Sequence, residues 1–516
     1  MLTEDFQVRR RELLVAGATL GAYAAASMVQ GCGGSGDFNA LSTAAQGNGG
    51  PLPDALGNFI QPIVLRSDSK TRLLDTTFVH AYATNQVGNQ TVNLRSYNGQ
   101  LTGPTLRVKP GDTLRILIDN QLPPDVDPVP PANISIPHQF NTTNLHTHGL
   151  HVSPQGNSDN VFVEIHPGDK FQYEYKIPAN HAPGTYWYHP HKHGSSSMQL
   201  FSGMAGALII EGGLDQVPEI AAARDIIYMM TELSVQPDGT VPAWTSDYPF
   251  TADDQRLLIN GQLRPALTAL SGEVIRLRVI NASVQTALPI QFAGHKLYVV
   301  ALDGNSLPSM REVDSLEIPP AGRADVLLKC GAPGTYQVTK LAATSLFPDP
   351  AAALGTLVVL NRSVQMNLPS QLPPPPYPNI TTAELTDTTV TTLTFEFNST
   401  LEPPPPGNFG NLTIDQRHFD PNRIDHTIPL NSVLQWNLVN NSDGGHPFHI
   451  HVNDFMVVSV NNVPLPEPEW HDTFTIPAFG SVQIRHRFTD FTGLFVLHCH
   501  ILTHEDPGMM QTVNVV

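Results

Sequence analysis

Cysteine is scarce in this sequence, with three residues in 516, at Cys32, Cys330 and Cys499. So few thiols do not support a disulfide framework. Cys32 lies in the N-terminal segment, and Cys330 is expected to be a buried apolar residue. Cys499 lies among histidines, so it is the thiol whose chemistry has to be explained.

Positive charge and methionine are also sparse. The sequence has 28 Lys and Arg against 46 Asp and Glu, a formal net charge of −18, and 11 Met. This acidic balance argues against nucleic acid as a partner and suits metal cations or neutral organic molecules. After the N-terminus, no apolar run is long enough to span a bilayer.

The N-terminus has the pattern of a targeting segment. Arg9, Arg10 and Arg11 precede a mildly apolar stretch rich in Ala and Gly, residues 15–29. This order is typical of a twin-arginine export signal, which carries proteins that are already folded. We therefore expect residues 1–57 to be export signal and flexible linker, with Cys32 as a candidate lipid anchor and a periplasmic or cell-surface location.

Turn residues are abundant, with 39 Gly and 46 Pro, and a pattern of turn, alternating strand and Asn occurs at 111–120, 272–281 and 431–440. Each copy continues into a strand that begins Gly-x-aromatic, at Gly184, Gly334 and Gly493. The repetition predicts an all-β chain of three consecutive Greek-key β-sandwich domains. Their expected limits are 58–215, 220–362 and 380–516. The proline-rich residues 372–378 would form a stiff linker, and Pro403–Pro406 a surface loop.

Eight histidines form four His-x-His pairs, and each pair places both rings on one face of a strand because side chains alternate along it. The pairs are His146/His148, His189/His191, His449/His451 and His498/His500. One such pair is an ordinary structural feature. Four pairs, divided between the first and third repeats and joined to a Cys, predict a metal site with enough imidazoles for three ions.

Cys499 separates His498 from His500, so a strand here directs the thiol to one face and both imidazoles to the other. Cys499, His504 and Met509 offer the thiolate, imidazole and weak thioether of a blue-copper centre, which needs one further His. His446, three residues before His449, can supply it. The segment therefore predicts two adjoining copper sites that share one strand.

The middle repeat lacks these donors. It has Thr339 and Leu341 where the outer repeats have the second His pair, and we align residues 290–292, Ile-Gln-Phe, with the first pair. Copper is therefore expected within the third domain and between the first and third domains.

These motifs resemble those of a three-domain multicopper oxidase of the bacterial laccase type, over nearly the whole mature length. The resemblance rests on residues 98–112, 146–149, 187–191, 446–451 and 498–509. It implies three cupredoxin-like domains and four copper ions: one type 1, one type 2 and two type 3. It also implies that electrons taken one at a time from a donor reduce O2 to water.

The resemblance further implies a role for each donor residue. The type 1 copper would be held by His446, Cys499, His504 and Met509, and the type 2 copper by His146 and His449. One type 3 copper would be held by His148, His189 and His500, and the other by His191, His451 and His498. Outside these sets, His193 is expected to be solvated or to support the ligands, His151 to hydrogen-bond near the cluster at most, and His295 to be structural.

Two carboxylates are expected to supply protons. Glu505 directly follows His504 and matches a family acid proposed to lie on the oxygen pathway. Near the type 2 copper the family places an Asp at a spacing that Asn157 occupies here, so a shifted loop makes Asp159 the candidate.

The motifs do not identify the electron donor. A laccase-like enzyme for phenols and aromatic amines is favoured over an oxidase of cuprous, ferrous or manganous ions, because no Met-rich insertion is present. The complete donor set counts against a non-enzymatic copper carrier or a scaffold that lost its metals. We expect a monomer whose partners are O2 and a small donor.

Overall fold

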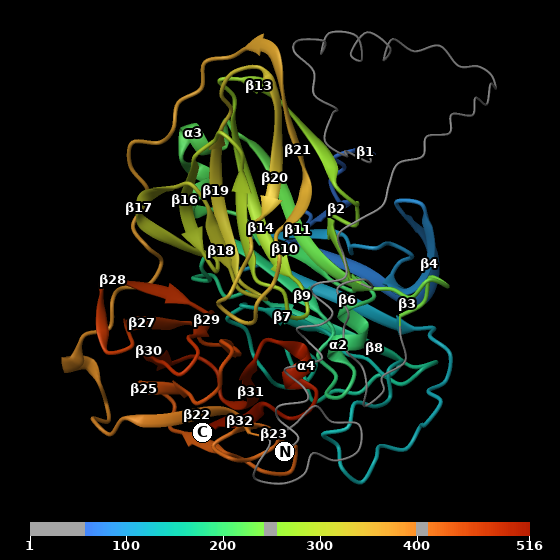
Figure 1. The fold of residues 1–516 in the computed structure, drawn as a ribbon. Helices are drawn as coiled ribbons and strands as arrows, with labels where there is room; N and C mark the ends of the chain where they lie inside the picture. The colour runs from blue at the N-terminus through green and yellow to red at the C-terminus, as the bar shows by residue number, and fades with distance from the viewer. Residues whose placement is uncertain (1–56, 242–254, 399–410) are drawn as a thin grey trace, which may run out of the picture. The chain divides into compact units, whose positions relative to one another are not determined.

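The computed structural model describes residues 57–241, 255–398 and 411–516. The expected export signal, Cys32 and the loop at 403–406 lie outside these residues. None of the helices within the described ranges is long and apolar enough to cross a membrane. Strands dominate and form three pairs of sheets that follow one another along the chain (Figure 1), so the predicted all-β class is confirmed.

The first pair combines a five-stranded sheet, ordered β2-β5-β10-β9-β7, with a four-stranded sheet, ordered β4-β3-β6-β8. The strands are β2 (Val64–Arg66), β3 (Leu73–Val87), β4 (Gln90–Tyr97), β5 (Thr105–Val108), β6 (Thr113–Asn120), β7 (His146–His148), β8 (Lys170–Lys176), β9 (Gly184–His189) and β10 (Gly206–Ile210). The short helix α2 (Ser196–Leu200) precedes β10, and the helical turns η1 (Gly213–Gln216) and α3 (Pro218–Ala221) lead to the next domain.

The second pair consists of two six-stranded sheets, ordered β1-β13-β21-β20-β15-β18 and β12-β11-β14-β19-β16-β17. The strands are β1 (Gly57–Asn58), β11 (Arg224–Ser234), β12 (Gln255–Ile259), β13 (Pro265–Ser271), β14 (Val274–Ala282), β15 (Leu288–Phe292), β16 (Leu297–Leu302), β17 (Asn305–Val313), β18 (Leu316–Ile318), β19 (Arg323–Lys329), β20 (Gly334–Lys340) and β21 (Ala352–Ser363). Strand β1 precedes the first domain in the chain but pairs with β13, so the described residues begin on the middle domain's sheet. The domain limits themselves stay predictions.

The third pair has a six-stranded sheet, ordered β23-β22-β25-β30-β27-β28, and a five-stranded sheet, ordered β24-β32-β31-β26-β29. The strands are β22 (Thr391–Asn398), β23 (Asn411–Ile414), β24 (His426–Ile428), β25 (Ser432–Asn440), β26 (His446–Ile450), β27 (Phe455–Val460), β28 (Val463–His471), β29 (Thr473–Ile476), β30 (Ser481–Phe488), β31 (Gly493–Cys499) and β32 (Met510–Val515). The turn η2 (Thr382–Glu384) precedes β22, and the short helix α4 (Leu502–Glu505) follows β31.

The three domains repeat the same connections. In one sheet of each domain a single pair of strands is parallel: β3 with β6, β11 with β14 and β22 with β25. The predicted alternating strands are the second members of these pairs, and the predicted Gly-x-aromatic strands are β9, β20 and β31. Each sheet also has neighbours that are not consecutive in the chain, such as β3 and β6, β14 and β19, and β26 and β31, so connections cross between the sheets as a Greek key requires.

Each sandwich encloses its own apolar core, because alternate strand residues face inward. Representative buried residues are Phe78 in the first core, Phe292 in the second and Trp436 in the third. Cys330 is a buried free thiol of the second core, so the predicted buried position is confirmed. A further cluster, which includes Trp187 and Leu502, joins residues of all three domains.

The first and middle domains approach at two glycines. A Cβ atom on Gly184, at the start of β9, would lie 2.4 Å from the backbone oxygen of Gly304. Since backbone cannot move aside as a flexible side chain can, Gly184→Ala should lower the free energy of unfolding by about 1–3 kcal/mol in thermal or denaturant unfolding. Gly57→Ala is the control, because nothing lies within 4 Å of its Cβ position. Equal stabilities for the two variants would contradict the close approach.

Candidate metal centre

The His pairs lie on neighbouring strands in both outer domains. In the first domain β7 pairs with β9, and His146 lies directly opposite His189. In the third domain β26 pairs with β31, and His449 lies directly opposite His498. The same antiparallel register therefore brings two pairs together in each domain.

The rings of the two domains interleave. His146 stacks on His451 with 3.9 Å between ring centroids, and His148 stacks on His449 at 3.8 Å. All eight side chains of the four pairs are buried, with at most 2% of their surface exposed. The imidazoles of the first and third domains therefore face one another and not solvent.

The donor atoms group in threes within this cluster. Those of His191, His451 and His498 lie within 4.8 Å of one another, which is one of the sets expected for a type 3 copper. Two other groups mix the expected sets: His146 with His148 and His189, and His146 with His449 and His451. His500 belongs to none of these groups, but its ring centroid lies 5.0 Å from that of His148 and 5.3 Å from that of His189.

Several ring nitrogens in the cluster are buried without a hydrogen-bond partner. They are Nε2 of His146, His189 and His449, Nδ1 of His148 and His451, and both nitrogens of His500. Buried polar atoms without partners are rare. Seven such nitrogens in one cluster therefore indicate a site for a bound group. Burial lowers the pKa of every one of these histidines, and neighbouring imidazoles add to the shift. Neutral rings with free lone pairs are the form that binds a metal, so the residues fit copper.

A second donor group lies on the other face of β31. The Cys499 sulfur lies 3.5 Å from His446 Nδ1 and 3.8 Å from His504 Nδ1, and these two nitrogens are 3.3 Å apart. His446 Nε2 contacts the Ser442 hydroxyl at 3.1 Å, which leaves Nδ1 directed at the sulfur. Met509 is fully buried, and its backbone bonds to both Cys499 and His504. One thiol and two imidazoles at this separation fit a blue-copper site.

The two candidate acids lie beside the cluster. Asp159 Oδ2 lies 2.9 Å from His146 Nδ1, while Oδ1 accepts hydrogen bonds from the Thr147 amide and hydroxyl. Burial raises the pKa of Asp159 to about 7. Glu505 is fully buried, with its carboxylate oxygens 3.1 Å from His498 Nδ1 and 3.5 Å from His191 Nδ1. Burial also raises the pKa of Glu505.

A third buried carboxylate, Asp472, was missed by the sequence reasoning. Its Oδ1 lies 3.2 Å from His148 Nε2, and its backbone oxygen accepts a hydrogen bond from His449 Nδ1 at 2.8 Å. Burial raises the pKa of Asp472, and the Arg323 guanidinium acts in the opposite direction. Asp472 lies between β28 and β29, and no His-x-His pair is next to it in the sequence. Only the folded chain therefore places Asp472 at the site.

The other histidines stand outside the donor groups. His193 contacts the Ile134 backbone oxygen at 3.0 Å, and His151 contacts the Val452 backbone oxygen and Asp490. His151 thus hydrogen-bonds next to the cluster residue His451, as expected. The His295 ring bonds to backbone, at Ala293 and Gly331, as a structural residue does.

The alignment of the middle repeat was wrong by one residue. Gln291 of β15 lies opposite Thr339 of β20, as His146 lies opposite His189. The counterparts of the first His pair are therefore Gln291 and Ala293, and not Ile290 and Phe292. The pairing of the two strands fixes this correspondence, which a count along the sequence did not give. Neither counterpart can bind a metal through an imidazole, so the conclusion about the middle domain is unchanged.

One ring of the second donor group reaches the surface. His504 is partly exposed, and Phe347 of the middle domain meets it edge to face, with ring centroids 5.7 Å apart at 81°. Phe347 itself is 42% exposed. The loop before His446 supports this ring, since a Cβ on Gly444 would lie 2.4 Å from Phe347.

Comparisons with known proteins agree with this geometry. Three family profiles, each described as multicopper oxidase, match residues 136–214, 231–358 and 377–516. A multicopper oxidase of Staphylococcus haemolyticus is 28% identical over 435 residues, which are 83% of this chain and 85% of the relative. A laccase of Bacillus stratosphericus is 24% identical over 472 residues, covering 82% and 91%.

The fold also matches solved structures. A multicopper oxidase of Campylobacter jejuni, described as a metallo-oxidase, superposes with a TM-score of 0.73 at 24% identity. The match covers 90% of this chain and 96% of that one. At this identity the likeness concerns the fold alone.

Proposed function

This chain belongs to the multicopper oxidase family, and from that premise we propose that it is a laccase-like enzyme for phenols and aromatic amines. It is an oxidoreductase that uses O2 as the electron acceptor, and it binds copper. The observation that carries the proposal is the burial of four His pairs against one another. Cys499 points to the opposite face of β31, the strand that carries His498.

We assign the donors to four copper ions by the family pattern. The type 1 copper would be held by His446, Cys499, His504 and Met509, and the type 2 copper by His146 and His449. The two type 3 coppers would be held by His148, His189 and His500, and by His191, His451 and His498. The grouping of His446, Cys499 and His504 supports the first set, and that of His191, His451 and His498 supports the last. The unpaired nitrogens of the cluster support the other two sets.

The copper ions would supply one-electron storage and the reduction of O2, which no side chain here can perform. The chain supplies the connection between the two donor groups, because Cys499 is bonded through backbone to both His498 and His500. It also excludes water, since the eight imidazoles are at most 2% exposed while His504 alone of the type 1 donors is partly exposed. Electrons therefore have one point of access, at the His504 edge.

Protons have separate carriers in this proposal. Asp159 would exchange a proton at His146 Nδ1, which its Oδ2 contacts, and Glu505 would do so near His191 and His498; these contacts support the proposal. The two carboxylates lie at different edges of the His cluster, so each would serve a different side of it.

The exposed Phe347 ring beside His504 favours phenols over metal ions as donors. The exposed Phe residues of the described chain are Phe347, Phe397 and Phe479, and all three adjoin the loop before His446. Phe397 and Phe479 bond to Ser442 through their backbone amides. Exposed aromatic rings offer stacking to an aromatic donor and no ligand to a metal ion.

An oxidase of cuprous, ferrous or manganous ions is the second candidate, and the acidic balance of the chain favours it. The deciding experiment loads the purified chain with copper and follows O2 uptake with dimethoxyphenol, cuprous ion or ferrous ion. We expect turnover of the phenol without free copper in the assay. Activity confined to the metal ions would reverse the order of the two candidates.

We also propose export of the folded chain by the twin-arginine route, from Arg9, Arg10 and Arg11. Cys32 would then be the residue for lipid attachment. Both lie outside the described residues.

Cys499→Ser should abolish the blue absorption of the type 1 copper and donor oxidation, because a hydroxyl is too hard a donor for this site. Copper bound by the eight imidazoles should be retained, as measured by metal analysis. Cys330→Ser is the matched control, since Cys330 is also a buried free thiol and lies in the middle core. Loss of blue colour in the control would point to misfolding.

Phe347→Ala should raise the KM for dimethoxyphenol about threefold to tenfold, because an aromatic edge contact contributes about 0.5–1.5 kcal/mol. The rate with ferrous ion should change by less than about twofold. Tyr82→Ala is the control, since Tyr82 is 39% exposed but lies on β3 of the first domain. Equal losses for phenol and metal ion would contradict a docking role for Phe347.

Asp159→Asn should slow O2 reduction by about 100-fold or more, the usual loss for a positioned proton carrier. Copper content and blue colour should be unchanged in air, whereas the type 1 copper should stay reduced during turnover. Asn157→Ala, at the alternative position in the loop, should have no such effect. If Asp159→Asn instead loses copper, Asp159 holds His146 and does not carry protons.

A further inference from the structure

Arg323 of the middle domain contacts all three domains at one point. It begins β19, is fully buried, and donates to both oxygens of Asp472 in the third domain, at 2.6 and 2.5 Å. Its Nε donates to the Thr185 backbone oxygen in the first domain at 3.1 Å, and the guanidinium lies 5.7 Å from the Tyr186 ring centroid. Thr185 and Tyr186 belong to β9, the strand that ends at His189. A domain without copper donors thus reaches both domains that have them.

Asp472, which Arg323 binds, also contacts two histidines of the cluster, His148 and His449. Asp472 Oδ1 and the Thr473 hydroxyl lie 3.2 and 3.1 Å from His148 Nε2, so Nδ1 is the free nitrogen of that ring. The Asp472 backbone oxygen accepts from His449 Nδ1, so Nε2 is the free nitrogen of this second ring. The two histidines come from different domains and stack on each other. The position of Asp472 therefore decides which nitrogen each ring presents.

Gly149 shows how closely the chain packs around this contact. It follows His148, has φ of +83°, and a Cβ there would lie 2.3 Å from Asp472 Oδ2 and 2.6 Å from Arg323 Nη2. The glycine of the His-Thr-His-Gly motif thus makes room for the ion pair as well as for the turn.

We propose that Arg323 is a positioning residue of the His cluster: by clamping Asp472 it fixes the orientation of His148 and His449. The inference rests on the proposed function, because it concerns the type 2 and type 3 donors assigned there. Its chemical basis is the planar fork of the guanidinium, which holds both carboxylate oxygens and the Thr185 carbonyl at once. A Lys would keep the charge but could not hold that geometry.

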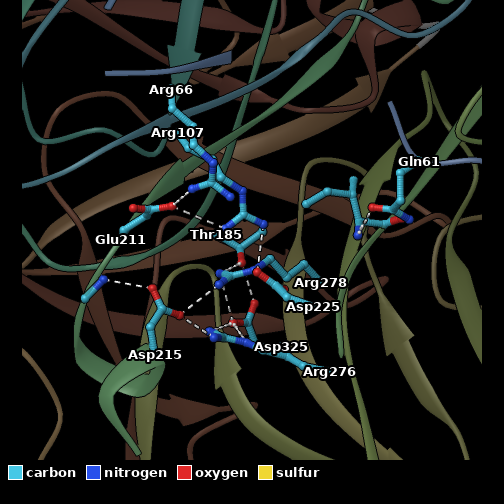
Figure 2. Close-up of polar contacts among 12 residues, drawn as sticks. Gln61, Arg66, Arg107, Thr185, Glu211, Asp215, Asp225, Arg276, Arg278 and Asp325 are labelled. Carbon is cyan, nitrogen blue, oxygen red and sulfur yellow. Dashed lines mark hydrogen bonds and ion pairs between the residues drawn. The ribbon is translucent and has the colours of Figure 1, made fainter. Parts of the chain in front are cut away.

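The middle domain has a second buried arginine that serves as a matched control. Arg278 on β14 is 1% exposed and bonds to Asp225, to Asp215 and to the Thr185 hydroxyl of the first domain (Figure 2). Arg276 pairs with Asp215 and Asp325 in the same network (Figure 2). Arg278 thus shares the burial, the ion pairs and even the neighbour Thr185 with Arg323, but its carboxylate partners do not contact the cluster.

The test compares Arg323→Lys with Arg278→Lys in the full chain. Copper affinity is measured by titration of the metal-free protein, the type 2 copper by electron paramagnetic resonance, and the type 1 copper by its blue absorption. We expect Arg323→Lys to weaken copper binding at the cluster about 10-fold to 100-fold, the usual loss for a partner behind a ligand, and to change the type 2 signal. The blue absorption should remain. Arg278→Lys should lower the melting temperature of the metal-free protein without changing either copper signal.

Asp472→Asn keeps the proposal testable if Arg323→Lys folds poorly. The side chain keeps its shape but cannot accept from the guanidinium with both terminal atoms, so the same change in the type 2 signal is expected. Combined with Arg323→Lys it should add little further loss of copper affinity, since both changes break one contact. An unchanged type 2 signal in Arg323→Lys or Asp472→Asn, or equal changes in Arg278→Lys, would overturn the inference. If the unmodified chain binds no copper at the cluster, the proposed function itself fails.

Discussion

The alternation of side chains along β31 is the constraint on which the site depends. Because successive residues point to opposite faces, His498 and His500 can face the first domain only if Cys499 faces the core of the third. The sulfur is then fixed 3.5 Å from His446, and the rings of the neighbouring residues are fixed against His191 and His148. A one-residue slip in the pairing of β31 with β26 would exchange the two faces and destroy both donor groups at once.

The register of β31 is in turn protected by the burial around it. Every residue from Phe495 to Cys499 is buried, and the strand lies between β26 and β32 in the middle of its sheet. Donors such as His146, His449 and Cys499 are therefore placed by strands that also build the hydrophobic core. His191, His451 and His500 lie one or two residues beyond the ends of such strands.

Much of the fold and the site could be predicted because both are written in periodic patterns. The three alternating strands, the three Gly-x-aromatic strands and the four His pairs each have a fixed spacing, and the structure brings the predicted donors together. Asp472 could not be found in this way, because its role depends on contacts with His148 and Arg323, which are 324 and 149 residues away in the sequence. The alignment of the middle domain failed for the same reason: with no His pair to mark the register, only the pairing of Gln291 with Thr339 reveals it.

The free nitrogens of the cluster also give a role to the carboxylates around it, Asp159 and Asp472. Without metal, at least six buried rings keep a nitrogen that bonds to nothing, which costs stability and favours collapse of the rings onto each other or rotation toward other partners. A frame that holds them apart must be stable on its own, before copper binds. The ion pairs of Asp472 and the hydrogen bonds of Asp159 act on the outward nitrogens of the rings, where a metal cannot compete for them. The middle domain, which has no donors, can serve this frame without disturbing the copper sites, because its arginines approach the rings only through a carboxylate.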